Sequence, residues 1–586
     1  MNAVQHTFLR YRSFAALGVI GLSSLACTAA VGGPVPSGGG APSDLPGGGA
    51  GQTGGSSNAG VGAGANSNGG GSAGMTADLS KGGPKLRVLT QAEYKNSLAD
   101  LLGTIKAPLV LPDDTFVAGF TAIGGAEIAI NSSTVDIYET ASRAATAEVF
   151  ADATRWQKLV GCQPKADLSD ACVATFIQTV GKRAFRRNLA DDEVQQWLQV
   201  GKDVAALPGS SAAQGLAAIT SGLLQSPNFL YRVETNRLDA TSGRLKYDGA
   251  SMATRLSFML TGHPPSDALL AAAAAGQLDT AEGVRTAAAP LLNDPSAVDR
   301  MATFFGEVSR ADLVSIVQKD PALFPTFNAS LQGSMLQATQ LFIKNIVLAP
   351  GADMRSFYDS DQTFVDANLA PLYGVAVPAS GFAQIKLAAD SGRAGILGQA
   401  AVLAGHSQPD HNSPTRRGVF ISSTFLCLVP LNPPAGVITV LPVDPTLTAR
   451  KLLEVHRTSP SCNVCHKVFD PLGFGLEHFD SIGKYRALEG TLPIDATGTL
   501  DGVAYDGGAQ MGAAFRQSAT AQACMMSNFY RNANGVEDAV ADTAQIDALS
   551  KTLMGKNYVW RDFVAEFVVS DAFRSAPAAA VMAGNQ

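Results

Sequence analysis

The residues with the most specific chemistry in this sequence are Cys462, Cys465 and His466, which form a C-x-x-C-H motif within SCNVCHKVFD. Two thiols three residues apart can bond the two vinyl groups of one haem, while the imidazole of the next residue binds the iron. The same thiols could instead form a disulfide or contribute to a zinc site. We interpret the motif as the attachment site of one covalent haem c, with zinc and a plain disulfide as the alternatives.

A haem iron used for electron transfer normally has a second axial side chain. Met511 is one candidate, because it follows His466 at a separation that small cytochromes use for their methionine ligand. The other candidates are His406 and His411, in a polar loop that would have to fold back, and His456, a helical turn or more before the motif. An open iron would instead favour small-molecule or peroxide chemistry, and a zinc site would need His456 or His478 to complete it.

The segments on either side of the motif must position it. TLTARKLLEVHR, at 446–457, has the pattern of an amphipathic helix that leads into the motif. Asp470-Pro471, followed by glycines at 473 and 475, predicts that the chain breaks into a turn. Four apolar residues of that turn could exclude water from a macrocycle or could simply pack in the core: Leu472, Phe474, Leu476 and Phe479.

The remaining cysteines suggest two disulfides. Cys162 and Cys172 bound a short polar loop, so a local disulfide is the simplest pairing. Cys427 and Cys524 are then paired by elimination across a long stretch of chain. The seventh, Cys27, ends the phrase Leu-Ala-Cys and resembles the lipidated cysteine of a bacterial lipoprotein.

The first 85 residues have the composition of an export signal and a tether. Residues 1–27 contain Arg10 and Arg12 and then an apolar run, which is the order of a signal peptide. Residues 28–85 are rich in glycine and serine and predict a disordered, flexible linker. We therefore expect an outer-membrane or cell-surface lipoprotein, or alternatively a periplasmic or secreted protein, that touches the membrane only through a lipid anchor.

The remaining chain predicts a mainly α protein built from several helical modules in series. Apolar residues recur at helical spacing, and Thr90 with Glu93 has the pattern of a capping box. Strand-like alternation is limited to 126–130 and 437–441. With 586 residues and a net charge of −7, the chain lacks the basic runs that track a phosphate backbone, so we expect no nucleic-acid partner. We predict helical modules at 86–155, 156–235 and 236–376, a cytochrome-c-like module with the C-x-x-C-H motif at 390–487, and a C-terminal helical module at 495–575.

Longer phrases resemble a known family. HRTSPSCNVCHKVFDPLGFGLEHFDSIGKYR, at 456–486, and SPTRRGVFISSTFLCLVPLNPPAGV, at 413–437, resemble the planctomycete cytochrome C domain of exported multidomain proteins from planctomycetes and myxobacteria. Phrases that begin at Leu89, Phe176, Gly222, Arg255 and Thr363 resemble the companion planctomycete-specific domains of unknown function. FYRNANGVED, at 529–538, departs from the family's C-terminal phrase.

The resemblance implies haem c chemistry and no established activity for the companion modules. We expect an exported c-type haem protein that transfers electrons to or from an unknown redox partner protein. One alternative is a haem-dependent redox enzyme with an unknown substrate, so the sequence leaves enzymatic activity open. The other is an exported binding scaffold held together by zinc or a disulfide.

Overall fold

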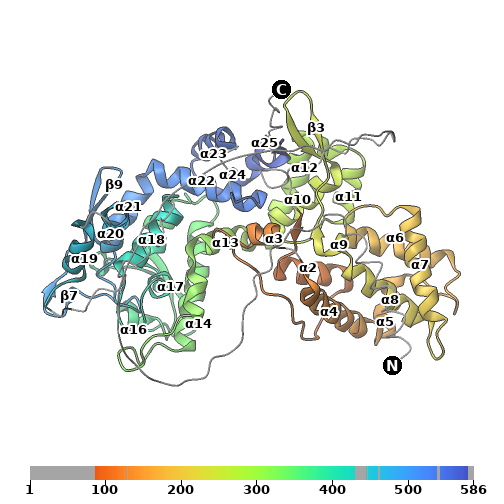
Figure 1. The fold of residues 1–586 in the computed structure, drawn as a ribbon, viewed down its shortest axis with the longest axis horizontal. Coiled ribbons are helices and arrows are strands. Elements are labelled where there is room, and N and C mark those ends of the chain that lie inside the picture. The colour runs from red at the N-terminus through yellow and green to blue at the C-terminus, as the bar shows by residue number, and fades with distance from the viewer. Residues whose placement is uncertain are drawn as a thin grey trace, which may run out of the picture. The chain divides into compact units, whose positions relative to one another are not determined.

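The computed structural model describes residues 86–128, 130–428, 444, 446–458, 462–537 and 542–578. The described chain is mainly helical, as the sequence predicts (Figure 1). Three sequence predictions lie outside these residues: the signal with Cys27, the 28–85 linker and the strand at 437–441. None of the described helices is long and apolar enough to cross a membrane.

The first group of helices shares one hydrophobic core, which includes Leu98, Phe176 and Leu223. This core joins the two predicted modules 86–155 and 156–235. The predicted capping box is confirmed, because Thr90 Oγ1 accepts from the Glu93 amide and Glu93 Oε2 accepts from the Thr90 amide, both at 3.2 Å. The helices are α2 (Gln91–Leu102), α4 (Ser132–Phe150), α5 (Ala153–Val160), α6 (Ala171–Phe185), α7 (Asp191–Ala205), α8 (Ala212–Gln225) and α9 (Pro227–Leu230).

A second hydrophobic core extends through the predicted modules 236–376, 390–487 and 495–575. Phe305, Phe357, Phe425 and Trp560 are among its fully buried side chains. Its helices before the motif are α3 (Thr121–Glu127), α10 (Gly249–Thr261), α11 (Asp267–Ala274), α12 (Ala281–Leu292), α13 (Ser296–Ser309), α14 (Ala329–Phe342), α15 (Ser356–Asp359), α16 (Ala370–Tyr373), α17 (Ala400–Gly405) and α18 (Pro414–Phe425). Those that follow are α19 (Ala449–Thr458), α20 (Asn463–Phe474), α21 (Gly507–Gln517), α22 (Ala519–Asn534), α23 (Thr543–Gly555), α24 (Trp560–Phe567) and α25 (Asp571–Arg574).

The described strands are short and pair antiparallel. β4 lies between β3 and β11, so it joins residues near 240 to the C-terminal end of the described chain. The pairs are β1 (Arg87–Val88) with β2 (Tyr231–Arg232), β3 (Asn236–Asp239) with β4 (Arg244–Tyr247), β4 with β11 (Ser575–Pro577), β5 (Gln362–Val365) with β6 (Ala383–Lys386), β7 (Leu488–Glu489) with β8 (Leu492–Pro493), and β9 (Thr497–Leu500) with β10 (Val503–Asp506).

The predicted strand at 126–130 is wrong. Thr121–Glu127 is the helix α3, and the described residues 128 and 130 belong to no strand. The helix buries Ile123 and packs its glycines against other backbone: a Cβ on Gly124 would lie 1.8 Å from the Thr115 carbonyl oxygen. Tertiary packing therefore determines the structure of this segment, although its short alternation of apolar and polar residues is typical of a strand.

Helices α18 and α20 approach each other at two glycines. A Cβ on Gly418 would lie 2.0 Å from the Phe469 carbonyl oxygen, and a Cβ on Gly473 would lie 1.8 Å from the Pro414 carbonyl oxygen. Four residues forward along α18 thus correspond to four residues back along α20, so the two helices run antiparallel. Only residues without a side chain fit at these two crossing points.

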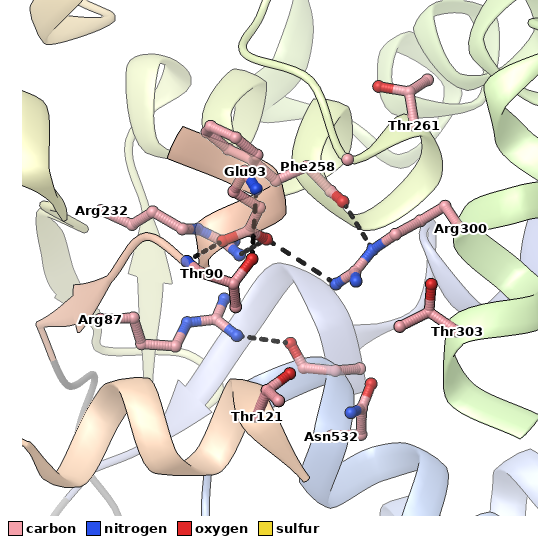
Figure 2. A network of polar contacts seen from close by, with 12 residues as sticks. Arg87, Thr90, Glu93, Thr121, Arg232, Phe258, Thr261, Arg300, Thr303 and Asn532 are labelled. Atoms are coloured by element: carbon pink, nitrogen blue, oxygen red, sulfur yellow. Dashed lines mark hydrogen bonds and ion pairs between the residues drawn. The ribbon is translucent and has the colours of Figure 1, made fainter. Parts of the chain in front are cut away.

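A buried network of charges connects early and late parts of the chain. Glu234 lies 2.6 Å from Arg255, 3.2 Å from Arg87 and 3.4 Å from Arg232. Figure 2 shows Glu93 facing the guanidinium groups of both Arg232 and Arg300, each at 3.8 Å. Burial opposes ionisation of Glu234, but the three arginines outweigh it and lower the pKa of Glu234 to about 2.

The C-terminal phrase FYRNAN supplies partners for this network. Asn534 Oδ1 accepts from Arg255 at 2.7 Å, and the Ala533 carbonyl accepts from Arg87 at 3.3 Å. Asn532 donates to Glu307 Oε2 at 3.0 Å. These residues at the end of α22 therefore dock on β1, α10 and α13, which is a structural role for the phrase that departs from the family pattern.

The close approach of α18 and α20 predicts that a single methyl group added at the crossing destabilises the fold. Gly473→Ala should lower the free energy of unfolding by about 2 kcal/mol, because the new methyl group overlaps the Pro414 backbone. Gly333→Ala is the matched control, since Gly333 lies within α14 and its Cβ would meet nothing within 4 Å. Chemical denaturation measures both variants. Equal stability of the two would contradict the described packing.

The charge network predicts that the contribution of Glu234 to the stability of the fold depends on pH. Glu234→Gln should cost about 3 kcal/mol at pH 7, because ionised Glu234 stabilises the fold above its ordinary pKa of 4.5. That stabilisation is lost as pH falls from 4.5 towards about 2. The difference between wild type and variant should therefore be about 2 kcal/mol smaller at pH 3 than at pH 7.

Unfolding curves at the two pH values measure this difference. Glu282→Gln is the control, because the Glu282 side chain is 82% exposed. A Glu234→Gln deficit that is equal at both pH values would show that the carboxylate charge does not stabilise the network.

Candidate functional site

The C-x-x-C-H motif lies at the start of α20. Cys462 is the N-cap residue, and Cys465 and His466 follow in the first turns of the helix. Both thiols are partly buried, and among the described cysteines they are the two outside any disulfide. The spacing of three residues places both thiols on the same side of the helix, as attachment to one ligand requires.

The imidazole of His466 is oriented by a buried carboxylate one helical turn later. His466 Nδ1 lies 2.9 Å from Asp470 Oδ2, and Thr415 of α18 donates to Asp470 Oδ1 at 3.0 Å. The Asp470 side chain is fully buried. Burial raises the pKa of this carboxyl, and the hydrogen bonds from His466 and Thr415 oppose that rise. With Nδ1 engaged, Nε2 is the ring nitrogen that a metal would take.

The helix continues through the predicted break at Asp470-Pro471. α20 extends to Phe474 with Pro471 inside it, so the chain does not break at Asp470-Pro471, and the predicted turn comes later, at 475–478. Two tertiary contacts support this segment: Tyr505 donates to the Pro471 carbonyl at 3.1 Å, and Gly473 packs against Pro414. The role of Asp470 was not predicted from the sequence, although a carboxylate four residues after a histidine in a helix lies within reach of its ring.

A cavity of about 440 Å³ opens beside α18. Its lining mixes apolar, basic and imidazole side chains, including Arg310, His406, Thr415, Arg416, Val419 and Phe420. Thr415 belongs both to this lining and to the hydrogen-bonded chain through Asp470 to His466. Thr415 is therefore the residue at which the cavity meets this hydrogen-bonded chain, and no residue of α20 belongs to the main lining.

His406 lies in the cavity wall at the end of α17. Its Nδ1 is 2.9 Å from the Val402 carbonyl oxygen, and its ring stacks on Phe420 with centroids 3.8 Å apart. Burial lowers the pKa of His406 to about 4, so the imidazole is neutral at neutral pH. A neutral imidazole with one nitrogen engaged is the form that binds metals.

Arg310 lies in the cavity wall and comes from the end of α13. Among the described residues its buried Nε has no hydrogen-bond partner; the side chain lies 3.5 Å from Asp312, and its guanidinium lies over the ring of Phe116, 5.2 Å from the centroid. Arg416, on α18, is exposed. The cavity thus has two guanidinium groups in its lining, one of them with a buried donor that lacks a hydrogen bond.

The other predicted ligands lie elsewhere. Met511 is fully buried in the second core, where its Sδ packs close to Gly475. His411 is 60% exposed and pairs with Asp410, and His478 Nδ1 lies 2.9 Å from the Arg486 carbonyl oxygen. The side chain of His456 lies outside the described residues. The predicted apolar wall, Leu472, Phe474, Leu476 and Phe479, is buried in the core and does not belong to the main lining of the cavity.

The structure contains both predicted disulfides. Cys162 bonds Cys172, and Cys427, just after α18, bonds Cys524 of α22. The second disulfide joins the helix that packs on the motif to the helix that carries the FYRNAN phrase. Within the described part of the chain, no group of three or more His, Cys, Asp or Glu side chains is arranged to hold a metal ion.

Comparison with known families gives four matches in series. PSD3 (protein of unknown function, DUF1587) matches 87–151, PSD5 (DUF1595) matches 172–234, and PSD4 (DUF1592) matches 248–375. PSCyt3 (protein of unknown function, DUF1588) matches 393–489 and contains the motif, His406, Thr415 and Asp470. No curated protein and no solved structure matches the chain. The chain belongs to the family of multidomain proteins in which planctomycete-specific domains accompany a planctomycete cytochrome C domain.

Proposed function

We propose that this protein is an exported electron-transfer protein that carries one haem c, bound covalently at Cys462 and Cys465 with His466 as an axial ligand. The observation that carries the proposal is the contact between His466 Nδ1 and the buried Asp470. Metal-binding histidines characteristically have such a second partner, which fixes the ring orientation and raises the basicity of the ligating nitrogen.

The described residues fit a haem. Cys462 and Cys465 lie one helical turn apart at the start of α20, as attachment to one macrocycle requires. His466 follows directly, and the contact of its Nδ1 with Asp470, which also accepts a hydrogen bond from Thr415, orients the ring.

The chain's own residues would hold the group and set its environment. Each thiol of Cys462 and Cys465 would add across one vinyl group, so that an S–C bond replaces S–H, the hydrogen passes to the other vinyl carbon, and nothing is oxidised or reduced. Asp470 would hold the His466 ring and make Nε2 a stronger donor to the iron. When bound, haem supplies one-electron ferric–ferrous chemistry, with redox partner proteins as electron donor and acceptor.

The N-terminal sequence supports export and a lipid anchor. Residues 1–27 have the order of a signal peptide, and Cys27 would become the lipidated residue of an outer-membrane or cell-surface protein. The Gly/Ser-rich linker at 28–85 would separate the body from the membrane surface. Attachment of haem to C-x-x-C-H also takes place outside the cytoplasm, so the two features agree.

Haem attachment is the first test. The full chain, produced in a host with cytochrome c maturation, should retain haem on a denaturing gel stained for haem peroxidase activity. Cys462→Ser/Cys465→Ser should lose the stain, because no thioether can form. Cys162→Ser/Cys172→Ser is the control: it also removes two cysteines, but should keep the stain.

Fractionation of the same cultures tests the anchor. Wild type should sediment with membranes, whereas Cys27→Ser should be found in the soluble fraction. Wild type that folds and is exported but carries no haem would overturn the proposed function and favour the scaffold held by disulfides.

The role of Asp470 predicts a shift in reduction potential. Asp470→Asn keeps an oxygen acceptor near His466 Nδ1 but removes the negative charge that favours the ferric iron. The potential should rise on the order of 40 mV, which corresponds to about 1 kcal/mol for one electron. Spectroelectrochemistry measures the shift, with Glu454→Gln on the exposed surface of α19 as the control. An unchanged potential in Asp470→Asn would contradict the assigned contact.

A further inference from the structure

The cavity beside α18 is separate from the C-x-x-C-H motif. Among the described residues that form its main lining, none comes from α20. His406, in the lining, stacks on Phe420, whereas α20 meets α18 at Gly418. Two positions along a helix turn the side chain by about 200°, so Phe420 and Gly418 lie on nearly opposite faces of α18. The cavity can therefore hold a ligand of its own.

Two guanidinium groups give the cavity its charge. Arg310 lies 3.5 Å from Asp312, and the exposed Arg416 side chain has no hydrogen-bond or ion-pair partner among the described residues. Burial lowers the pKa of His406 to about 4, and the charges of Arg310 and Arg416 contribute to this shift, so both cations lie near the ring. No acidic residue belongs to the described main lining. The cavity therefore favours an anion, because guanidinium groups bind carboxylates and phosphates through parallel hydrogen bonds.

Three neutral polar side chains of the lining already donate their hydrogens within the protein. Thr415 donates to the Asp470 carboxylate at 3.0 Å, and Ser423 donates to a backbone carbonyl one turn earlier at 2.8 Å. Nδ1 of His406 lies 2.9 Å from the Val402 carbonyl oxygen, which can only accept, so Nε2 of the neutral ring is an acceptor. These three groups can therefore accept hydrogen bonds from a ligand. Hydroxyl groups suit them better than an amine, because the arginines repel a second cation.

The size and the apolar part of the lining fit a small organic molecule. The volume of about 440 Å³ lies in the range of small-molecule sites, about 300–1,000 Å³. Val419 and Phe420 offer apolar contacts to the carbon skeleton of such a molecule. The lining thus combines cationic donors, neutral acceptors and an apolar surface.

We propose that the cavity beside α18 binds a small hydroxylated organic anion, a sugar acid or a sugar phosphate, whose charged group is held by Arg310 and Arg416. Its hydroxyl groups donate to Thr415, Ser423 and His406. This inference goes beyond the proposed function and does not require haem, so haem attachment and ligand binding can each fail without the other. Arg310 belongs to the stretch matched by PSD4 and the other four residues belong to the stretch matched by PSCyt3, so two family domains contribute to the site.

Calorimetric titration of the full-length protein with four matched compounds tests the class of ligand. Glucuronate and glucose 6-phosphate carry an anionic group on a hydroxylated ring, glucose lacks the charge, and cyclohexanecarboxylate lacks the hydroxyl groups. We expect one site per chain for at least one of the two sugar anions. Glucose should bind at least about tenfold more weakly, because it leaves the guanidinium groups unpaired, and cyclohexanecarboxylate should do so because it leaves the acceptors unpaired.

The four titrations have distinct outcomes. Binding of glucuronate alone would assign a carboxylate, binding of glucose 6-phosphate alone would assign a phosphate, and binding of both would support the shared anionic chemistry. Failure of both anions to bind the folded protein would overturn the proposal. Equal affinities of glucuronate and cyclohexanecarboxylate would overturn the assigned hydroxyl contacts.

Variants of the lining test where the ligand binds. Arg416→Ala and Arg310→Gln should each weaken binding of the sugar anion by about tenfold or more, because each removes a charged donor. Ser423→Ala should weaken binding of the sugar anion but not of cyclohexanecarboxylate, which a general loss of structure would not do.

Arg561→Ala is the control for charge, because it removes an exposed arginine of α24 that is not in the main lining. It should leave every affinity unchanged, and thermal unfolding checks that all the variants fold. Wild-type affinity in folded Arg416→Ala and Arg310→Gln would overturn the placement of the anion in this cavity.

Discussion

The close contact between α18 and α20 is the constraint on which the candidate site depends. Gly418 and Gly473 let the two backbones meet where any side chain would overlap a carbonyl group. This contact brings the Thr415 hydroxyl to Asp470, and Asp470 holds the ring of His466. The orientation of the proposed iron ligand therefore depends on two residues that have no side chain. In general, the geometry of a metal ligand depends on the contacts that support it as well as on the motif that contains it.

The motif is also part of a larger packed unit. Its helices share a hydrophobic core with the preceding and following modules, and the disulfide Cys427–Cys524 joins α18 to α22. At the other end of α22, Asn534 binds the buried Arg255, and Asn532 binds Glu307. Arg310, at the end of the same helix as Glu307, reaches the cavity. The stretches matched by PSD4 and PSCyt3 thus share one hydrophobic core, which includes residues of the helix that carries the motif.

Local sequence signals predicted the features that depend on local chemistry. The helical class, the capping box at Thr90 and the pairing of Cys162 with Cys172 follow from composition and short spacing, and the structure confirms them. The predictions that were wrong concern segments whose local structure is determined by tertiary contacts. α20 passes through Pro471 because α18 and Tyr505 support it, and α3 replaces a predicted strand because its glycines pack on backbone. His406 could be named as a ligand candidate from the sequence, but its packing against Phe420 could not be predicted, because no local pattern encodes the fold of the intervening chain.

We propose that Cys462 and Cys465 bind haem through thioethers, with His466 on the iron. The most direct measurement is the alkaline pyridine spectrum of the reduced, purified full-length protein, because it reports whether the vinyl groups of a haem have been converted to thioethers. The spectrum should be that of c-type haem at one haem per chain, and the haem should resist extraction with acidified solvent. A protein that is folded and exported but has no haem spectrum, or whose haem is extracted with intact vinyl groups, would contradict the proposal.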